Sequence, residues 1–294
     1  MARTVLVAGS LHYDIIVETG HLPAVDETGV GSRWYPKFGG KGGNQAVSAA
    51  RQGTMARMVG AVGNDEFGLY LRRQLTAAGV DDRFVRTVDA GSGMSVATLL
   101  PNGDYAATIV SGANLTISAG DMVQDQIWAD VGLLVLQNEM PQGANLAAAT
   151  EARRRRIRTL LNAAPWRPLS VEFARLVDIL VVNAGEAAMM GTDAVDSLPL
   201  AAKAARRLAE RFESVIVTAG SHGLAAFGED DAEFIIPAER VVVVSSHGAG
   251  DAFIGALAAS LVAGSDLRSA CQAASAAAAR HVAGLTFVAS DRGF

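Results

Sequence analysis

The stretch His247-Gly248-Ala249-Gly250-Asp251 combines the residue types that phosphate chemistry needs. Its glycines lack a Cβ atom, so backbone N–H groups can approach an anion closely. The Ala- and Leu-rich residues 252–263 predict a helix immediately after it, and a helix N-terminus carries unpaired N–H groups and partial positive charge. Asp251 then stands beside a phosphate cradle, where it could take a proton from an attacking hydroxyl. The stretch predicts phosphoryl transfer from a nucleotide.

A second glycine-rich cluster covers residues 38–46, where four glycines surround Lys41 and precede Asn44. The glycines allow close backbone approach, and the two side chains supply hydrogen-bond donors for a polyhydroxyl or anionic ligand. The spacing does not match the Gly-x4-Gly-Lys-Ser/Thr phosphate loop. The alternative interpretation is a flexible strand-to-helix turn without a ligand.

Polar residues also follow several predicted strands. Asp14 comes after the first strand, Glu139 after residues 132–136, Asn183 and Glu186 after 179–182, and a Gly-rich turn at 218–223 after another. The alternatives are a loop acid for Asp14, a surface acid for Glu139, and a helix N-cap with a first-turn acid for the Asn183–Glu186 pair. Ligands of α/β sheets bind at the carboxyl ends of parallel strands, so these groups would meet on one edge.

The elements that would position these groups alternate along the chain. Apolar runs separated by amphipathic helices predict an α/β fold with a central, mostly parallel sheet flanked by helices. Strands are expected at 5–8, 56–59, 132–136, 157–161, 179–182, 215–217, 224–227, 233–236 and, as a buried strand, Val241 to Val244. Helices are expected at 43–51, 66–78, 144–153 and 200–212, before two Ala-rich helices at the C-terminal end.

Two segments, residues 14–38 and 94–110, lack helical periodicity and carry turn residues. They predict β-hairpins attached to the α/β body, placed to act as a lid over the sheet edge. The expected organisation is one domain over residues 1–294 with a discontinuous β lid formed by about 11–38 and 93–111.

Composition limits the class of partner. A net charge of −5 and a pI near 5.6 argue against nucleic acid, and the run Arg153 to Arg156 is expected to be a solvated helix end. No apolar run is long enough to span a bilayer, and the chain enters a strand almost at once, without a signal-peptide pattern. Cys271 is the single cysteine, so no internal disulfide can form. A cytoplasmic protein is expected.

Taken together, these clusters resemble the ribokinase branch of the PfkB carbohydrate kinase family, in order and over nearly the whole chain. The similar segments are 9–14, 38–46, Ser111-Gly112-Ala113-Asn114, Glu139, Asn162-Ala163-Ala164-Pro165, 183–186, 218–220 and 248–251. The resemblance implies a mostly parallel sheet between helices with a β lid, and a homodimer formed through that lid.

The resemblance also implies site roles. Asp251 would be the base, and the N–H groups of Gly248, Ala249 and Gly250 would form the anion hole for γ-phosphoryl transfer. The sugar would be held by His12, Asp14, Gly40, Lys41, Asn44 and Glu139. The ATP site would be lined by Asn183, Glu186, Thr218, Gly220, Gly223 and Ser275, with Glu186 organising Mg²⁺ through water.

The chain departs from the family in three places. Ser245-Ser246 replaces the usual Asp-Thr, which weakens a K⁺ site that the family would build from Ser245, His247, Gly284 and Ser290, because a carboxylate is lost. His12 stands where ribokinases usually have an Asn that contacts the sugar. Residues 284–290 replace a Gly-x-x-Pro-Ser-like segment and a further helix, so either the chain is naturally short or the nucleotide edge is less covered.

The predicted function is ATP-dependent phosphorylation of a primary hydroxyl of a small sugar, with ribose as the default. A nucleoside kinase of the same family is an alternative, with Tyr13, Trp34 and Tyr35 available to stack on a base. A catalytically silent sugar- or nucleotide-binding protein is a second alternative. No Gly-x-Gly-x-x-Gly follows the first strand, which disfavours a Rossmann dehydrogenase.

Overall fold

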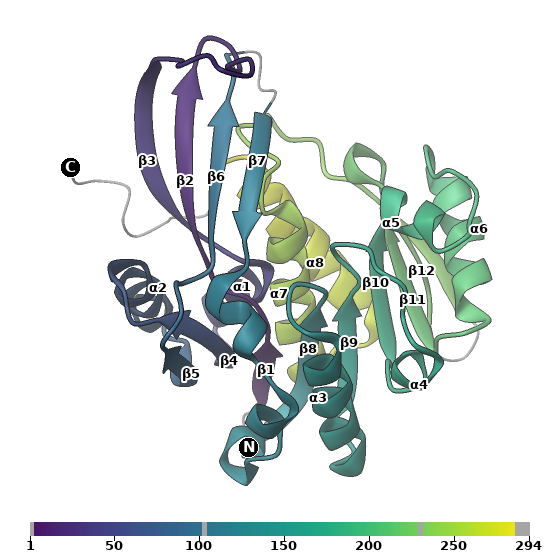
Figure 1. Ribbon diagram of the computed structural model, residues 1–294. Coiled ribbons are helices and arrows are strands. Elements are labelled where there is room, and N and C mark those ends of the chain that lie inside the picture. Colours follow the sequence, from purple (N-terminus) through teal and green to yellow (C-terminus); the bar gives the residue numbers. More distant parts are fainter. Residues whose placement is uncertain (1–2, 102–104, 229–231, 286–294) are drawn as a thin grey trace.

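The structure is a computed structural model that describes residues 3–101, 105–228 and 232–285 (Figure 1). Its main sheet has the strand order β13-β12-β11-β10-β9-β8-β1-β4-β5. The seven neighbouring strands β11, β10, β9, β8, β1, β4 and β5 run parallel. At one edge β12 pairs antiparallel with β11, and β13 pairs antiparallel with β12. The predicted mostly parallel sheet is therefore confirmed. Its strands are β1 Thr4–Ala8, β4 Met55–Gly63, β5 Asp81–Val88, β8 Val131–Gln137, β9 Arg158–Asn162, β10 Ile179–Asn183, β11 Ser214–Thr218, β12 Gly223–Phe227 and β13 Glu233–Pro237.

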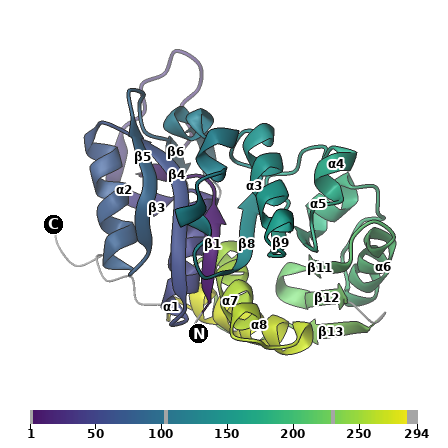
Figure 2. The ribbon, with the colours of Figure 1, turned by 90° about the horizontal axis from the view of Figure 1, so that it is seen from below.

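Helices cover both faces of this sheet because its central strands are apolar on both sides. Alternate residues of β1 enter different cores: Leu6 and Ala8 belong to one, Val5 and Val7 to the other. The first core is closed by α3 Gln142–Arg154 and α6 Leu198–Ala209, with the short α4 Val171–Ala174 and α5 Ala184–Met189 beside them. The second is closed by α1 Lys41–Arg51, α2 Glu66–Ala77, α7 Ala249–Val262 and α8 Leu267–Val282. Figure 2 shows α3 on one side of the sheet and α7 and α8 on the other.

Short 3-10 helices complete the connections. They cover Gly112–Thr116, Ala119–Met122, Asp125–Trp128 and Gly220–His222. Within the described ranges, no helix is both long and apolar enough to cross a lipid bilayer.

A small sheet stands off the main one (Figure 1). It contains β2 His12–Thr19, β3 Gly31–Gly39, β6 Met94–Leu99 and β7 Tyr105–Val110, in the order β3-β2-β6-β7. Both predicted hairpins form, and their inner strands β2 and β6 pair in parallel. At its base the Tyr13 ring stacks on Phe67 of α2 with centroids 4.0 Å apart, and meets Tyr70 edge-on. These ring contacts tie the small sheet to the body.

The prediction of a buried strand at Val241 to Val244 is wrong. These residues lie in an irregular segment between β13 and α7, and Val242 and Val244 are 84% and 71% exposed. The main sheet ends at β13, and the described part of the chain does not pair this apolar run with it. Its link to the body is a pair of hydrogen bonds from the N–H groups of Val244 and Ser245 to the carbonyl of Val282. β-branched composition indicates strand tendency but supplies no pairing partner.

The two functional helices begin earlier than periodicity predicts. α1 starts at Lys41 rather than residue 43, and α7 at Ala249 rather than residue 252. In both, the N-cap is a glycine with positive φ, Gly40 at 86° and Gly248 at 82°. Asp251 consequently lies inside the first turn of α7, where backbone N–H groups lack partners within the helix.

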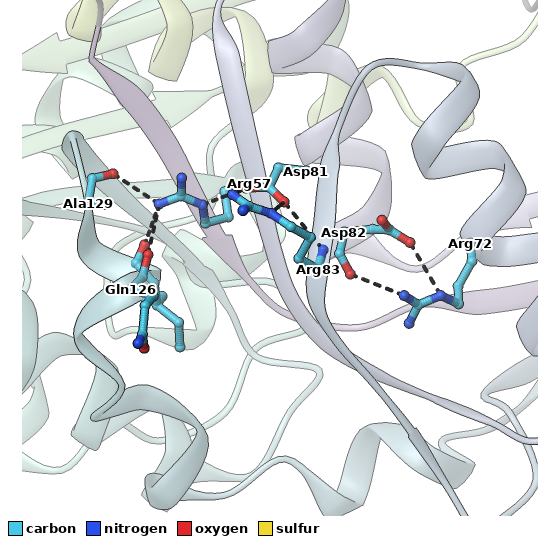
Figure 3. Close-up of polar contacts among 8 residues, drawn as sticks. Arg57, Arg72, Asp81, Asp82, Arg83, Gln126 and Ala129 are labelled. Carbon is cyan, nitrogen blue, oxygen red and sulfur yellow. Dashed lines mark hydrogen bonds and ion pairs between the residues drawn. The ribbon is translucent and has the colours of Figure 1, made fainter.

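A buried arginine cross-links the sheet near the amino end of β4 (Figure 3). Arg57 donates from Nε to Oδ2 of Asp81 at 2.8 Å, and from a terminal nitrogen to the carbonyls of Ile127 at 2.7 Å and Ala129 at 2.9 Å. It therefore joins β4, β5 and the 3-10 turn that precedes β8. Arg83 reaches the same carboxylate from the surface.

The arginine run ends α3, as predicted. Arg153 pairs with Asp178, Arg154 with Glu151, and Arg155 with Asp125. The partner of Arg153 is buried, whereas Asp125 is exposed.

Candidate active site

Glu139, in the turn after β8, links two of the predicted clusters. Its Oε2 accepts hydrogen bonds from Ser10 Oγ at 2.5 Å and from the backbone N–H of Lys41 at 2.9 Å. The loop after β1, the turn after β8 and the first residue of α1 therefore meet at one carboxylate. A Cβ at Gly40 would lie 2.7 Å from the carbonyl oxygen of Ser10, so this approach requires glycine.

Asp251 is joined to α1 by two amide side chains. Gln45 Nε2 donates to Oδ1 at 2.8 Å, and Asn44 Nδ2 donates to Oδ2 at 3.3 Å. The side chain is buried, and loss of water raises the pKa of Asp251 to about 6, against the opposing effects of the nearby Lys41 charge and the Gln45 hydrogen bond. A carboxyl group with this pKa is ionised at neutral pH and still basic enough to accept a proton.

The turn before Asp251 presents backbone N–H groups at the start of α7. Gly248 adopts the left-handed conformation that allows the chain to enter the helix at this point. The Ala249 N–H donates back to the carbonyl of Ser246 at 3.2 Å. Of the three predicted anion-hole amides, Ala249 is therefore partly engaged within the turn, and those of Gly248 and Gly250 flank it.

Asp14 reaches the site from the small sheet. Ser95 Oγ on β6 donates to its Oδ1 at 2.5 Å, and a Cβ at Gly39 would lie 2.0 Å from Oδ2. Burial raises the pKa of Asp14, while the Ser95 hydrogen bond and the charges of His12 and Lys37 lower it. Gly39 thus leaves room for a buried carboxylate that keeps one oxygen for other contacts.

His12 is a buried residue with an unused polar atom. Only 5% of it is exposed, and its Nε2 has no hydrogen-bond partner among the described residues. A buried ring nitrogen without a partner is costly in the free protein, so a ligand hydroxyl is a natural partner for it.

The predicted nucleotide residues lie on or directly after β10 and β11, apart from Ser275 in α8. Asn183 and Glu186 form a reciprocal capping box: Asn183 Oδ1 accepts from the Glu186 N–H at 2.8 Å, and Glu186 Oε2 accepts from the Asn183 N–H at 2.9 Å. The N-cap alternative therefore describes this pair correctly, and it leaves one Glu186 oxygen outside the box. The side-chain hydrogen bonds of Asp251 go instead to Asn44 and Gln45 of α1.

The glycines of that set have conformational roles. Gly220 and Gly223 have positive φ values of 54° and 114°, and a Cβ at Gly223 would lie 2.1 Å from the carbonyl oxygen of Ile236. Thr218 ends β11, with its hydroxyl 3.4 Å from the carbonyl oxygen of Val182. Ser275 lies half-buried in α8. Glycine at positions 220 and 223 therefore permits the turn between β11 and β12.

The residues of the family's cation site have other partners here. His247 N–H donates to Ser245 Oγ at 3.3 Å, and His281 Nε2 donates to the carbonyl oxygen of His247 at 2.9 Å. Burial and the charges of Lys37, Lys41 and His281 lower the pKa of His247 to about 4. Gly284 lies near Val244, and Ser290 is outside the described residues.

Three residues that hold the site were not singled out from the sequence. Ser10 anchors Glu139, Ser95 anchors Asp14, and Gln137 holds Gln45 through Nε2 at 2.7 Å. Ser10 lies inside a quoted motif and could have been found there. Ser95 and Gln137 lie on strands with no local signal.

Comparison with known proteins gives the class. The chain matches the pfkB family carbohydrate kinase over residues 2–284. It is 36% identical to a ribokinase from Mus musculus over 262 residues, covering 87% of this chain and 81% of that protein. It is 33% identical to a deoxyribokinase from Salmonella typhi over 286 residues, covering 95% and 92%. The solved structure of Arabidopsis thaliana ribokinase complexed with ribose and ATP has a TM-score of 0.89 at 29% identity, covering 96% of this chain and 93% of that one.

The fold is therefore ribokinase-like, and the protein is a sugar kinase. The chain belongs to the pfkB family of carbohydrate kinases.

Proposed function

We propose that this protein transfers the γ-phosphoryl group of ATP to a primary hydroxyl of a small sugar, with ribose as the default substrate. The observation that carries the proposal is the buried carboxylate of Asp251, in the first turn of α7 and hydrogen-bonded to Gln45 and Asn44. A carboxylate beside helix N-terminal amides can take a proton where phosphate charge is also stabilised.

In the proposed reaction the sugar hydroxyl gives its proton to Asp251. The hydroxyl oxygen forms a bond to the γ-phosphorus, the bond from that phosphorus to the bridging oxygen breaks, and ADP leaves. Charge on the transferring group is stabilised by the N–H groups of Gly248 and Gly250, with Ala249 in the same turn. The Lys41 ammonium lies close enough to Asp251 to lower its pKa, and it adds positive charge to this corner.

The sugar is held, in this proposal, between the body and the small sheet. Asp14 Oδ2, His12 Nε2 and Asn44 supply hydrogen-bonding groups for hydroxyls, and Gly40 and Glu139 shape the floor. His12 is the residue most able to change sugar preference, because its free ring nitrogen is buried and must be matched by the ligand. A pentose or a 2-deoxypentose would satisfy these groups to different extents.

ATP would lie along the β10–β12 half, against Asn183, Thr218, Gly220, Gly223 and Ser275. Within the described residues no cluster of three or more His, Cys, Asp or Glu could hold a metal ion. Mg²⁺ commonly binds through one carboxylate, waters and substrate phosphates, which fits the Glu186 oxygen that lies outside the capping box. When bound, the ion would neutralise phosphate charge.

We further propose one catalytic domain carrying the small sheet, about residues 11–38 and 93–111, as its lid. Strand register puts Trp34, Val96 and Val110 on the face opposite Asp14, and these side chains are 64%, 37% and 53% exposed. An apolar lid face fits a homodimer formed through the lids. The cytoplasm is the proposed setting, since ATP is the co-substrate and Cys271 is an unpaired, buried thiol.

The test is an ATP-consumption assay across ribose, 2-deoxyribose, hexoses, polyols and nucleosides, with the Asp251→Asn variant beside wild type. Turnover with a sugar that falls by roughly 10²–10⁴-fold in Asp251→Asn supports the proposal. Asp193→Asn, a surface carboxylate paired with Lys203, is the matched control and should leave turnover unchanged. Phosphorylation of nucleosides alone would favour the nucleoside kinase, and no turnover with any acceptor would favour a binding protein.

A further inference from the structure

Asp251 is the end of a chain of buried amides that runs through the core. Gln137 Nε2 donates to Gln45 Oε1 at 2.7 Å, and Gln45 Nε2 donates to Asp251 Oδ1 at 2.8 Å. The main-chain carbonyl of Gln137 in turn accepts from Asn145 Nδ2 at 2.9 Å. The chain connects α3, the end of β8, α1 and α7, which are elements far apart in the sequence.

The carboxylate of Asp251 sets the donor-to-acceptor direction of these hydrogen bonds. An ionised carboxylate only accepts hydrogen bonds, so the NH₂ group of Gln45 must face Asp251 and its carbonyl oxygen must face Gln137. Gln137 must then donate. Gln45 and Gln137 are both fully buried, so water does not compete for these bonds.

Gly9 leaves the space that the Gln137 side chain occupies. A Cβ at Gly9 would lie 2.0 Å from Gln137 Oε1, and that oxygen has no hydrogen-bond partner among the described residues. Keeping an amide there with one unsatisfied oxygen is unfavourable for stability. An apolar side chain of similar length would fill the same volume without that cost, which argues that the amide serves the site.

The two oxygens of Asp251 are held unequally. Oδ1 receives the 2.8 Å bond from the buried chain, whereas Oδ2 has a longer contact of 3.3 Å from Asn44 on the side of the Gly40–Lys41 turn. Building on the proposed function, we propose that Gln45 and Gln137 are positioning residues for phosphoryl transfer: they hold Oδ1, and Oδ2 is the oxygen that accepts the hydroxyl proton.

The physical consequence is measurable. Gln45 stabilises the ionised form of Asp251, and it opposes the burial that raises the pKa of this group to about 6. A hydrogen bond to a charged group contributes enough that its loss should raise this pKa by roughly one to two pH units. The acid limb of kcat should move up by the same amount.

The variants are Gln45→Met, Gln137→Met and the double variant, with Gln52→Met at the exposed C-cap of α1 as the control. Gln45→Met should lower kcat about twofold to tenfold at pH 7 and about fivefold to fiftyfold at pH 6, with most activity restored at pH 9. Gln137→Met should cause a smaller shift in the same direction, since Gln45 keeps its bond to Asp251. The double variant should match Gln45→Met in its pH profile. It should unfold at a higher urea concentration than Gln45→Met, because the Gln137 amide that loses its partner in the single variant is no longer present.

A carboxyl ¹³C titration of Asp251 provides a readout independent of turnover. An unchanged midpoint in the double variant, or a kcat lowered equally at every pH, would overturn the positioning role. Full turnover in Asp251→Asn would instead refute the proposed base, whatever the glutamine variants do. The two failures are therefore distinguishable.

Discussion

Replacing Arg57 with methionine tests whether one buried guanidinium holds the amino end of the sheet together. The change removes the ion pair to Asp81 and the hydrogen bonds to the carbonyls of Ile127 and Ala129 (Figure 3). The side chain of Arg57 is 9% exposed and that of Asp81 is 18% exposed. Truncation leaves the carbonyls of Ile127 and Ala129 without this donor and leaves Asp81 with Arg83 as its cation. Breaking a buried pair in this way costs up to about 3–5 kcal/mol. Against a typical unfolding free energy of about 5–15 kcal/mol, this is a large loss.

Arg83 provides the matched control because it contacts the same carboxylate from the surface. Its side chain is 72% exposed, so Arg83→Met should cost about 0–1 kcal/mol. Urea unfolding followed by circular dichroism measures both. Equal losses in the two variants, or a loss below about 1 kcal/mol for Arg57→Met, would refute the argument that burial decides the strength of the pair.

The same cluster predicts a pH dependence. Hydrogen bonds from Arg83 and Arg57 lower the pKa of Asp81 well below its usual range. A depressed carboxyl pKa contributes stability that is present above the unfolded pKa of about 4 and is lost as the pH falls toward the folded pKa. The difference between wild type and Arg57→Met should therefore shrink in urea titrations below about pH 4.

Three further predictions concern the site and the lid. Burial raises the pKa of Asp251 to about 6, so the folded protein holds this proton more tightly than the unfolded chain does. Asp251→Asn should therefore raise the free energy of unfolding by about 1–3 kcal/mol at pH 8, measured by urea titration. This stabilisation should disappear below about pH 4, where the wild-type carboxyl group is protonated in both states. K⁺ should change kcat by less than about twofold relative to Na⁺, since Ser245 supplies no charge for the ion; strong K⁺ activation would contradict this. His12→Asn should change the KM ratio between ribose and 2-deoxyribose by about tenfold with little effect on kcat, and an unchanged ratio would refute a role of His12 in sugar preference. Trp34→Glu should shift the protein toward the monomer in sedimentation velocity, and an unchanged sedimentation coefficient would refute dimer formation through the lid.

Much of the fold followed from short-range physics. The apolar run at Val5–Ala8 predicts a strand buried on both faces, and the two cores that it enters confirm that. The Ala- and Leu-rich residues 252–263 predict a helix, and α7 forms there, although it begins three residues earlier, at Ala249. The reason is that dihedral preference and periodicity act within a few residues, so they can be read along the chain. The two hairpins of the small sheet were predictable on the same grounds.

Partners distant in the sequence were decided by the tertiary structure alone. Val241 to Val244 has strand composition yet remains exposed and joins neither sheet among the described residues. Gln45 meets Asp251 across 206 residues, Gln137 meets Gln45 across 92, and Ser95 meets Asp14 across 81. No local pattern distinguishes such a glutamine or serine from a surface one. The residue types of the catalytic corner are thus legible in the sequence, while the bonds that orient them arise only when the parallel strands bring their carboxyl ends to one edge.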